Sequence, residues 1–208
     1  MTITVRGQPP GRAGVTWLLR RRQVAERGSD LLERKLRILL AEEQDYALRV
    51  GRTRQRWEQA CADLELWLLR SAIVSGERGL RLATDGAPAT IEIEWRLTMG
   101  VRYPAQAVGG MSATGGFAPD NSALHYATSA AQDALDAGIE HAAASAALAA
   151  ITAEIAATRR QLRALQRMWL PRLETALAHV SVQLYDIEHD EHVRLRWAAD
   201  ATRGRRLR

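Results

Sequence analysis

The chain has 208 residues, so its length alone allows one or two domains of ordinary size. It contains a single Phe, and aromatic residues make up only 5%, so Ala and Leu carry most of the apolar content. This composition disfavours a thick globular core and favours thin seams between helices, as in a bundle or coiled coil. The net charge of +5, with Lys35 as the only lysine, would suit an acidic partner, but 24 acidic residues are interleaved with the arginines.

Other function classes find little support. No nucleic-acid-reading motif accompanies the positive charge, so direct binding to nucleic acid is not expected. The only cysteine, Cys61, cannot form an internal disulfide, and the sequence shows no secretory signal. We also expect no apolar stretch of about 18 residues, the length that crosses a bilayer. The sequence therefore predicts a cytoplasmic protein without direct membrane insertion, with tails at 1–15 and, rich in arginine, at 202–208.

Residues 16–75 are predicted to form one long helix, because the segment has no Pro and only Gly28 and Gly51 as weak points. Mostly apolar residues recur along it every seven positions, with a second set four residues later, which is typical of a coiled-coil seam. The first set is Leu18, Ala25, Leu32, Leu39, Tyr46, Thr53, Ala60 and Trp67. The second set is Arg22, Ser29, Leu36, Glu43, Val50, Trp57, Leu64 and Ser71. Polar members weaken the seam toward the N-terminus.

Residues 76–122 are predicted to form a middle insert that is rich in Gly and Pro. Part of it alternates apolar and polar residues, the period of a strand with one buried face. The apolar members are Ile91, Ile93, Trp95 and Leu97. Met99 and Gly100 offer a turn, and a short second strand that ends at Pro104 completes a β-hairpin over about residues 90–104.

The Gly- and Ala-rich stretch 105–120 is interpreted as a mobile loop. Gly110 and Gly115 within it have the spacing of a phosphate-binding P-loop. However, Gly116 and Phe117 stand where that motif needs Lys and Ser or Thr, so neither phosphate nor magnesium has its ligand. We therefore expect a linker here and no nucleotide cofactor.

A second long helix is predicted over residues 123–201, with Gly138 as a potential interruption. The residues that can cap its first free amides are Asp120, Asn121 and Ser122. Eleven residues between 137 and 157 are Ala, which allows a close approach to a partner helix.

The apolar seam of this second helix changes its spacing midway. Its members are Leu148, Ile151, Ile155, Thr158, Leu162, Leu165, Trp169, Leu173, Leu177, Val180, Leu184 and Ile187. From Leu165 to Leu177 the seam takes three consecutive steps of four, which indicates a four-residue insertion that unwinds a left-handed supercoil. Pro171 lies inside these steps, and a proline in a helix interior costs roughly 3 kcal/mol. We therefore predict a bend or relaxed turn. The residues expected to hold it against the partner helix are Trp169, Leu170 and Leu173.

Two long helices joined by an insert most simply pack as an antiparallel pair. The predicted fold is mainly α: a long antiparallel two-helix coiled coil, with a small middle insert that contains a short β-hairpin. Roughly 55 residues at 1.5 Å each would make the first helix a rod of about 80 Å. Both chain ends would then lie at one tip and the insert at the other.

Three motifs resemble the D subunit of the V-type and archaeal A-type rotary ATPases, the central rotor stalk. AERGSDLLERKLRILL at 25–40 is similar to the family run Gly-His-x-Leu-Leu-Lys-x-Lys-Arg-Asp-x-Leu at Gly28, Leu31, Leu32, Lys35 and Leu39. RRQLRALQRMWLPRLE is similar to the family's Arg-Arg-Val-Asn-Ala-Leu-Glu-x-x-x-Ile-Pro-Arg-Leu-Glu at Arg160, Ala164, Leu165, Pro171, Arg172, Leu173 and Glu174. GVRYP at 100–104 resembles the family's Gly-Val-x-x-Pro. The departures are Ser29 for His, Leu36 and Arg37 for Arg-Asp, Arg163 for Asn, and Gln166 for Glu.

The resemblance implies a shaft without catalytic residues, cofactor or metal. In the family this shaft passes through a head built from the catalytic A and regulatory B subunits, and with the small F subunit it sits on a funnel-like subunit above the membrane ring. It transmits torque between ATP hydrolysis or synthesis in the head and ion transport in the ring. The family hairpin is associated with ATPase modulation, so deleting 90–104 is expected to change the hydrolysis rate more than assembly.

The resemblance also implies which residues meet partners. Those in the helices are Gly28, Leu31, Leu32, Lys35, Arg160, Ala164, Leu165, Pro171, Arg172, Leu173 and Glu174. Those in the hairpin are Ile91, Ile93, Trp95, Leu97, Gly100 and Pro104. A free-standing antiparallel coiled-coil adaptor that binds an acidic or nucleic-acid partner is the alternative, and salt-sensitive binding to DNA would favour it.

Three other patterns have plain structural explanations. His189 and His192 lie three residues apart with acids between them and could hold a metal, but the family has an acidic helical run in the same place, which favours a solvated face. Cys61 has no adjacent His, so it is not expected to act as a nucleophile. Four tryptophans are expected in the core because they lie at or near the seams. They are Trp57, Trp67, Trp169 and Trp197.

Overall fold

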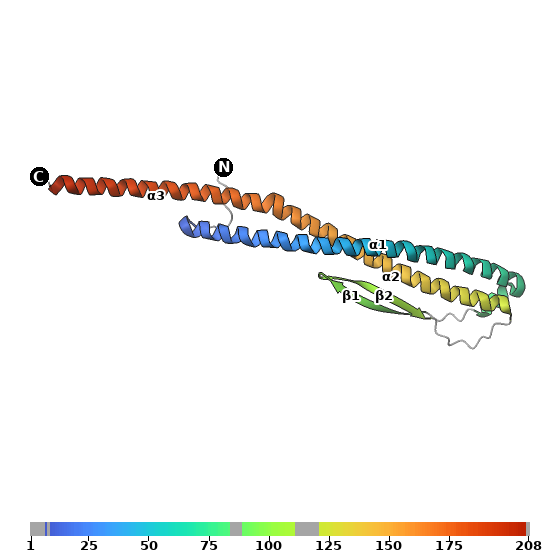
Figure 1. Cartoon of the computed structure of the whole chain (residues 1–208). Helices are drawn as coiled ribbons and strands as arrows, with labels where there is room; N and C mark the ends of the chain where they lie inside the picture. Colours follow the sequence, from blue (N-terminus) through green and yellow to red (C-terminus); the bar gives the residue numbers. More distant parts are fainter. Residues whose placement is uncertain (1–6, 8, 84–88, 111–120, 207–208) are drawn as a thin grey trace. The chain divides into compact units, whose positions relative to one another are not determined.

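The computed structural model describes residues 7, 9–83, 89–110 and 121–206. The elements in chain order are α1 (Gly11–Ala83), β1 (Thr90–Thr98), β2 (Val101–Gly110), α2 (Ser122–Ala164), the π-helical turn η1 (Leu165–Trp169) and α3 (Leu170–Arg206). Two long helical stretches pack together, and the two strands between them form an antiparallel hairpin (Figure 1). The prediction of a mainly α fold with a hairpin insert is therefore confirmed.

The contacts divide the chain into two units, each of which is described by itself. Unit 1 comprises Met1–Arg34 and Thr158–Arg208, and unit 2 comprises Lys35–Ala157. In unit 2 the helices run antiparallel: the Lys35 ammonium pairs with Glu154, and farther along α1 the Ser71 hydroxyl donates to the Ala123 carbonyl at 2.8 Å.

The predicted seam of α1 matches the buried face of this helix. Every one of its sixteen positions except Trp57 is buried or half-buried, so the heptad assignment is confirmed. Polar residues on the seam have partners: in unit 2 the Thr53 hydroxyl lies 3.2 Å from His141 Nδ1, and Glu43 accepts a hydrogen bond from the Thr152 hydroxyl at 3.0 Å. A buried polar group that keeps a hydrogen bond avoids most of its desolvation cost, so the seam tolerates these residues.

The hairpin packs through its second strand. Val101 and Tyr103 of β2 are buried with Tyr46 of α1 in the core of unit 2, and the two tyrosine rings meet edge to face with centroids 5.3 Å apart. The Tyr103 hydroxyl is 2.8 Å from Thr98 Oγ1 and 3.4 Å from Glu42 Oε2. Burying such a ring contributes roughly 2 kcal/mol, so β2 anchors the hairpin.

The outer strand does not have the predicted buried face. The apolar row of β1 is 46–70% exposed. Its members are Ile91, Ile93, Trp95 and Leu97. The prediction was wrong because Ile91, Ile93 and Trp95 border an open groove beside the small alanine side chains of α2, where they are not closely packed. The residues that make the buried contacts are thus on the strand that the sequence pattern marks less clearly.

The second strand is also longer than expected. It continues through Pro104 to Gly110, so the strand does not stop at the proline and the loop does not begin at Ala105. The register shifts opposite Glu94 and Trp95, where Ala105 is the extra residue of a β-bulge. A proline is compatible with an edge strand beside a bulge because no ladder hydrogen bond is lost there. Residues 111–120 of the predicted loop lie outside the described part of the chain.

Turns and caps at the ends of the elements follow local chemistry. Met99 and Gly100, both with positive φ (51° and 83°), form the predicted hairpin turn. Asn121 is the cap of α2: its Oδ1 accepts from the Leu124 amide at 2.8 Å, while its Nδ2 donates to the Ser75 hydroxyl at 2.6 Å. Gly76 interrupts α1 with φ of 64° and ψ of 176°.

Gly138 does not interrupt α2, contrary to the expectation. A Cβ at this position would lie 3.1 Å from Trp57 Nε1, so the glycine provides room for the indole. Trp57 in turn stacks on His141 with centroids 5.5 Å apart. The close approach of the Trp57 indole therefore explains the glycine at position 138, and a helix end does not.

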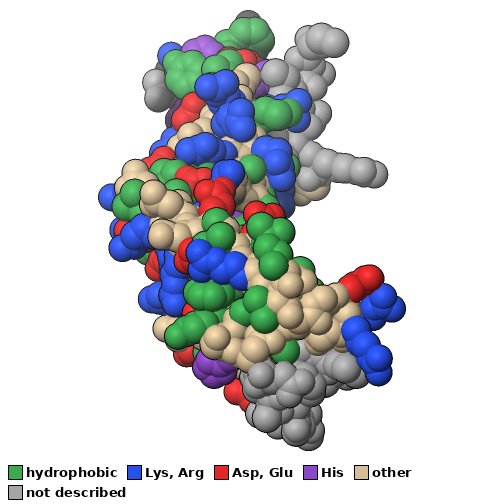
Figure 2. Space-filling model, turned by 90° about the vertical axis from the view of Figure 1, so that its right-hand side faces the viewer, with side chains coloured by type: hydrophobic (Ala, Val, Ile, Leu, Met, Phe, Trp, Pro, Cys, Tyr) green, Lys and Arg blue, Asp and Glu red, His purple; other side chains and the backbone are tan. Residues whose placement is uncertain are grey.

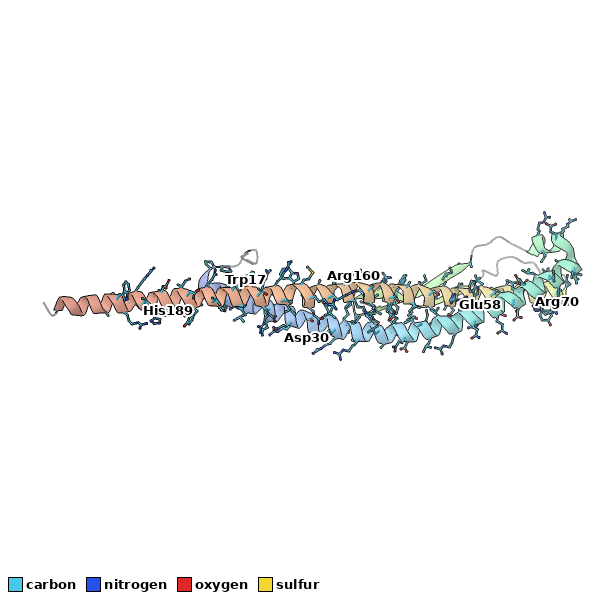
Figure 3. All side chains as sticks on the ribbon, turned by 90° about the horizontal axis from the view of Figure 1, so that it is seen from above. Trp17, Asp30, Glu58, Arg70, Arg160 and His189 are labelled. Carbon is cyan, nitrogen blue, oxygen red and sulfur yellow. The ribbon has the colours of Figure 1, made fainter. Side chains whose placement is uncertain are left out.

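In unit 1 the first turns of α1 pack against α3. Leu18, Leu173, Ala176 and Val180 form its buried cluster. The last described contact between the two helices is the ion pair of Arg12 and Glu188, and α3 continues past the start of α1 (Figures 1 and 3).

One stretch meets the length and composition criteria for a membrane span. It lies in the continuous helical region Ser122–Ala199, and 33% of the qualifying window is buried. The expectation that no stretch is apolar enough was therefore wrong by composition, since the run of alanines raises the apolar content. This is weak evidence for a span because core helices meet the same criteria.

Candidate interaction site

The helix backbone changes at the predicted relaxation point. In η1 the Leu170 amide donates to the Leu165 carbonyl, a bond between residues five apart where an α-helix would bond residues four apart. The helix through this stretch is therefore not regularly wound, which confirms the predicted disturbance next to Pro171.

Pro171 is accommodated because the π-turn comes immediately before it. Pro171 directly follows the π-turn, so its missing amide proton falls where the hydrogen bonds change from residues five apart to residues four apart. The wider turn also removes the crowding of the proline ring against the carbonyl four residues earlier. The π-turn thereby lowers the cost of the proline.

The same turn accounts for the changed seam spacing. Four residues of an α-helix advance by about 400°, so three consecutive steps of four would carry the seam about 120° around the helix. A π-turn takes more residues per turn, so a step of four inside it falls short of this advance. Leu165 and Leu173 thereby stay on the side that faces α1.

An open groove of about 530 Å³ lies beside this turn, between the first part of α1 and the helix that carries Pro171. Its lining residues are Trp17, Arg20, Arg21, Val24, Ala25, Gly28, Leu165, Trp169 and Leu173. The walls are mostly apolar, and the Arg21 guanidinium lies 4.5 Å from the centroid of the Trp17 ring. Such a groove suits an apolar side chain of a partner that also carries negative charge.

Trp169 lies in this groove and is 49% exposed, so it does not pack in the core as predicted. The same correction holds for Trp57 and Trp197, which are 39% and 76% exposed. Trp67 is half-buried and stacks on Tyr126 at 4.5 Å. Trp197 lies beyond the last described contact of α3 with α1, the ion pair of Arg12 and Glu188, so it has no partner helix to pack against in the described part of the chain.

The two segments that line the groove are rich in arginine, and we call this set of residues the arginine collar. Its members are Arg12, Arg20, Arg21, Arg22, Arg27, Arg34, Arg159, Arg160, Arg163, Arg167 and Arg172. The segments 11–34 and 158–180 contain these eleven arginines and only four acidic residues, an excess larger than the +5 of the whole chain. On the face drawn in Figure 2, positive and negative side chains are interspersed.

Most collar arginines lack a carboxylate partner. Within the described residues only Arg12, with Glu188, and Arg22, with Glu26, form an ion pair. The bond to Glu188 raises the pKa of Arg12 through its hydrogen bond and charge. The remaining guanidinium groups are available to an external anion or carboxylate, for which arginine offers a forked set of donors.

Two departures from the family motifs meet in space. Gln166 Nε2 donates to Ser29 Oγ at 3.0 Å and to Glu33 Oε1 at 2.7 Å. The family pattern has His and Glu at the positions of Ser29 and Gln166. This chain thus places a neutral hydrogen-bonded pair where the pattern has two ionisable residues.

The structure brings some of the predicted interaction residues together and separates others. Gly28, Leu165 and Leu173 line the groove, and Leu173 is only 2% exposed. Leu32 is half-buried on the α1 seam. The exposed members outside the groove are Leu31, Arg160, Ala164, Pro171, Arg172 and Glu174. Lys35 belongs to unit 2, where it pairs with Glu154.

Sequence reasoning missed the other half of this groove. Trp17, Arg20, Arg21 and Val24 carry no motif, and they were not predicted as site residues. A signal was present, because Trp17 and Arg21 are four residues apart and hence adjacent on one helical face. Trp17 and Arg160 are labelled in Figure 3.

The histidine pair His189 and His192 lies in α3. Among the described residues no three His, Cys, Asp or Glu side chains are grouped as metal ligands would be. His189 stacks on Tyr185 with centroids 6.3 Å apart.

Comparison with known proteins gives a consistent result. The model of one protein family, described as the D subunit of ATP synthase, matches residues 16–200. The D subunit of the A-type ATP synthase of Methanopyrus kandleri is 27% identical over 205 residues, which cover 96% of this chain and 88% of that protein. The D subunit of the A-type ATP synthase of Methanobrevibacter smithii is 26% identical over 201 residues, covering 91% and 85%. The family match includes both long helical stretches and the hairpin.

Proposed function

The chain belongs to the D-subunit family of ATP synthases, and from this premise we propose how it engages its neighbours in the complex. It is a non-catalytic central rotor stalk subunit of a membrane-associated A/V-type ATP synthase. A shaft of this kind needs stiffness and an asymmetric surface. The paired helices and the one-sided hairpin provide both.

The proposed partners are the catalytic A and regulatory B subunits of the head, the small F subunit of the stalk and the funnel-like subunit above the membrane ring. The chain would then be cytoplasmic and reach the membrane only through that funnel. The proposed domain boundaries remain those predicted from sequence: a tail at 1–15, a helix at 16–75, an insert at 76–122, a helix at 123–201 and a tail at 202–208.

The arginine collar is the surface that we assign to the head. The observation that supports this is the excess of guanidinium groups without an ion pair on the two segments that form an apolar groove. An acidic lining in the head would attract the collar at every angle of rotation, while each exposed contact is worth only about 0 to 1 kcal/mol and can exchange. The apolar groove would hold one side chain of the head at each resting position of the rotating shaft.

Charge removal tests this assignment. The variant Arg160→Gln with Arg167→Gln removes two exposed positive charges of the collar, one in α2 and one in η1. We expect at least about a tenfold weaker association with a reconstituted head of A and B subunits at low salt, and a smaller loss at high salt, where exposed charges are screened. ATP-driven ion transport by the reconstituted complex should fall with it.

The matched control is Arg52→Gln with Arg78→Gln, two exposed arginines of α1 in unit 2. It should leave head association unchanged. Equal loss in both variants would show that net charge matters and the collar does not. Salt-sensitive binding of the chain to DNA, lost in the collar variant, would instead favour a nucleic-acid partner for this surface.

A further inference from the structure

The two outer edges of the hairpin differ. Along β2 the edge is closed, because Pro104 has no amide proton and the Ala105 carbonyl accepts from Arg49 Nη1 at 2.8 Å. β1 pairs with β2 along one edge, and its other edge has no partner strand among the described residues. The nine residues of β1 contain no proline. Proteins usually block a free edge of this length, because its unpaired amides and carbonyls can pair with another chain.

The side chains of β1 are exposed on both faces. The apolar row of Ile91, Ile93, Trp95 and Leu97 is 46–70% exposed, which is unusual for four large apolar residues on one face of a strand. The opposite face carries Glu92, Glu94 and Arg96, and Arg96 is 4.0 Å from Glu42 of α1. The two glutamates have no described ion pair.

A groove continues the apolar face of β1. It has a volume of about 440 Å³ and lies between the hairpin and α2, which contributes Ile139 and the alanines at 142, 143, 146 and 150. Small side chains on the helix leave room beside Ile91, Ile93 and Trp95. A strand added along β1 would carry alternate side chains over the mouth of this groove.

We propose that β1 accepts an extended segment of a partner polypeptide as a third strand. The segment has apolar side chains toward the groove and Lys or Arg toward Glu92 and Glu94, since opposite charges on paired strands attract. A second copy of this chain is the less favoured occupant, because the antiparallel register that pairs each Glu92 with an Arg96 also sets Glu94 against Glu94. The site is separate from the arginine collar and does not depend on the assignment of the collar to the head.

The test uses the full chain and a nine-residue peptide that alternates Val with Lys, matched in length to β1. Hydrogen exchange of the amides in 90–98 should slow at least about tenfold with saturating peptide, while β2 amides change little. A Val–Glu peptide should have no effect. A Val–Lys peptide with N-methylated amides should also fail, because strand addition needs its donors.

Charge reversal makes the test specific. Glu92→Lys with Glu94→Lys should exchange the preference, so that the Val–Glu peptide protects β1 and the Val–Lys peptide does not. Asp45→Lys with Glu65→Lys makes the same change in net charge on exposed positions of α1 and should retain the original preference. Protection of β1 by neither peptide, or by both alike, overturns the proposal. So does concentration-dependent protection without peptide, which would identify a second copy as the occupant.

Discussion

Gly51 and Gly138 both lie inside helices but in different surroundings. A Cβ at Gly51 would meet nothing within 4 Å, whereas at Gly138 it would lie 3.1 Å from Trp57 Nε1. We expect Gly51→Ala to raise the free energy of unfolding by about 1 kcal/mol, the ordinary helix propensity difference. Gly138→Ala should gain clearly less because the indole must shift away from His141. Urea unfolding of both variants measures this, and equal gains would contradict the close approach.

Tyr46 gives a pH dependence. Burial, and next the neighbouring Tyr103, raise the pKa of Tyr46 above its ordinary value of 10.0. The folded state then holds the phenolic proton more tightly than the unfolded state, so this stability is complete below about pH 10 and is lost as pH rises through the folded pKa. Between pH 8 and 11.5, the free energy of unfolding should fall more steeply in the parent chain than in Tyr46→Phe.

The control for Tyr46 is Tyr185→Phe, which removes a phenol whose residue is 69% exposed. Its unfolding free energy should follow the parent chain across the same pH range. If Tyr46→Phe follows the parent as well, the buried ring pair of Tyr46 and Tyr103 does not control the alkaline transition.

The π-turn Leu165–Trp169 sets the position of the seam residues on both sides of it. Closing the turn into an α-helix would rotate Leu173, Ala176 and Val180 by about 100° relative to Leu165 and out of their cluster. We therefore expect Pro171→Ala to retain the turn and to change the free energy of unfolding by less than about 1 kcal/mol. Amide exchange of residues 165–170 would report whether the turn persists.

A proline placed elsewhere in the same helix provides the comparison. Ala178 is exposed in the interior of α3, and Ala178→Pro should cost about 3 kcal/mol. If Pro171→Ala instead stabilises the chain by a similar amount, the turn is a strain imposed by the proline and not a part of the seam.

At the element scale the sequence predicted what repeats and missed what depends on contacts between elements. The heptads of α1, the hairpin turn at Met99 and Gly100, and the cap position were all predictable from local spacing. The roles of the two strands were reversed, because the alternation of Ile91 to Leu97 resembles a buried strand while Tyr103 makes the actual contact. Trp17 was not predicted as a groove residue because the opposite wall, with Trp169, is about 150 positions away along the chain.

At the scale of the whole molecule the two units differ in how much apolar surface they bury. Unit 2 contains the seven-residue core cluster around Tyr46 and Tyr103, whereas unit 1 has four buried apolar residues and several polar ones on its seam, including Ser29. Thr158 is buried with no hydrogen bond to its hydroxyl in the described part of the chain, which costs about 1 to 3 kcal/mol. Unit 1 should therefore open first.

Native-state hydrogen exchange of the free chain measures this order. We expect amides of 11–34 and 170–199 to exchange at least about thirtyfold faster than amides of α1 and α2 in unit 2, a difference of about 2 kcal/mol. Ser29→Leu with Gln166→Leu replaces a hydrogen-bonded pair by apolar contact and should slow exchange in unit 1 alone. Uniform protection along both helices would contradict the two-level stability. If unit 1 gains protection when the head is added, its weak seam is completed by the partner, as expected of a shaft segment that works inside another protein.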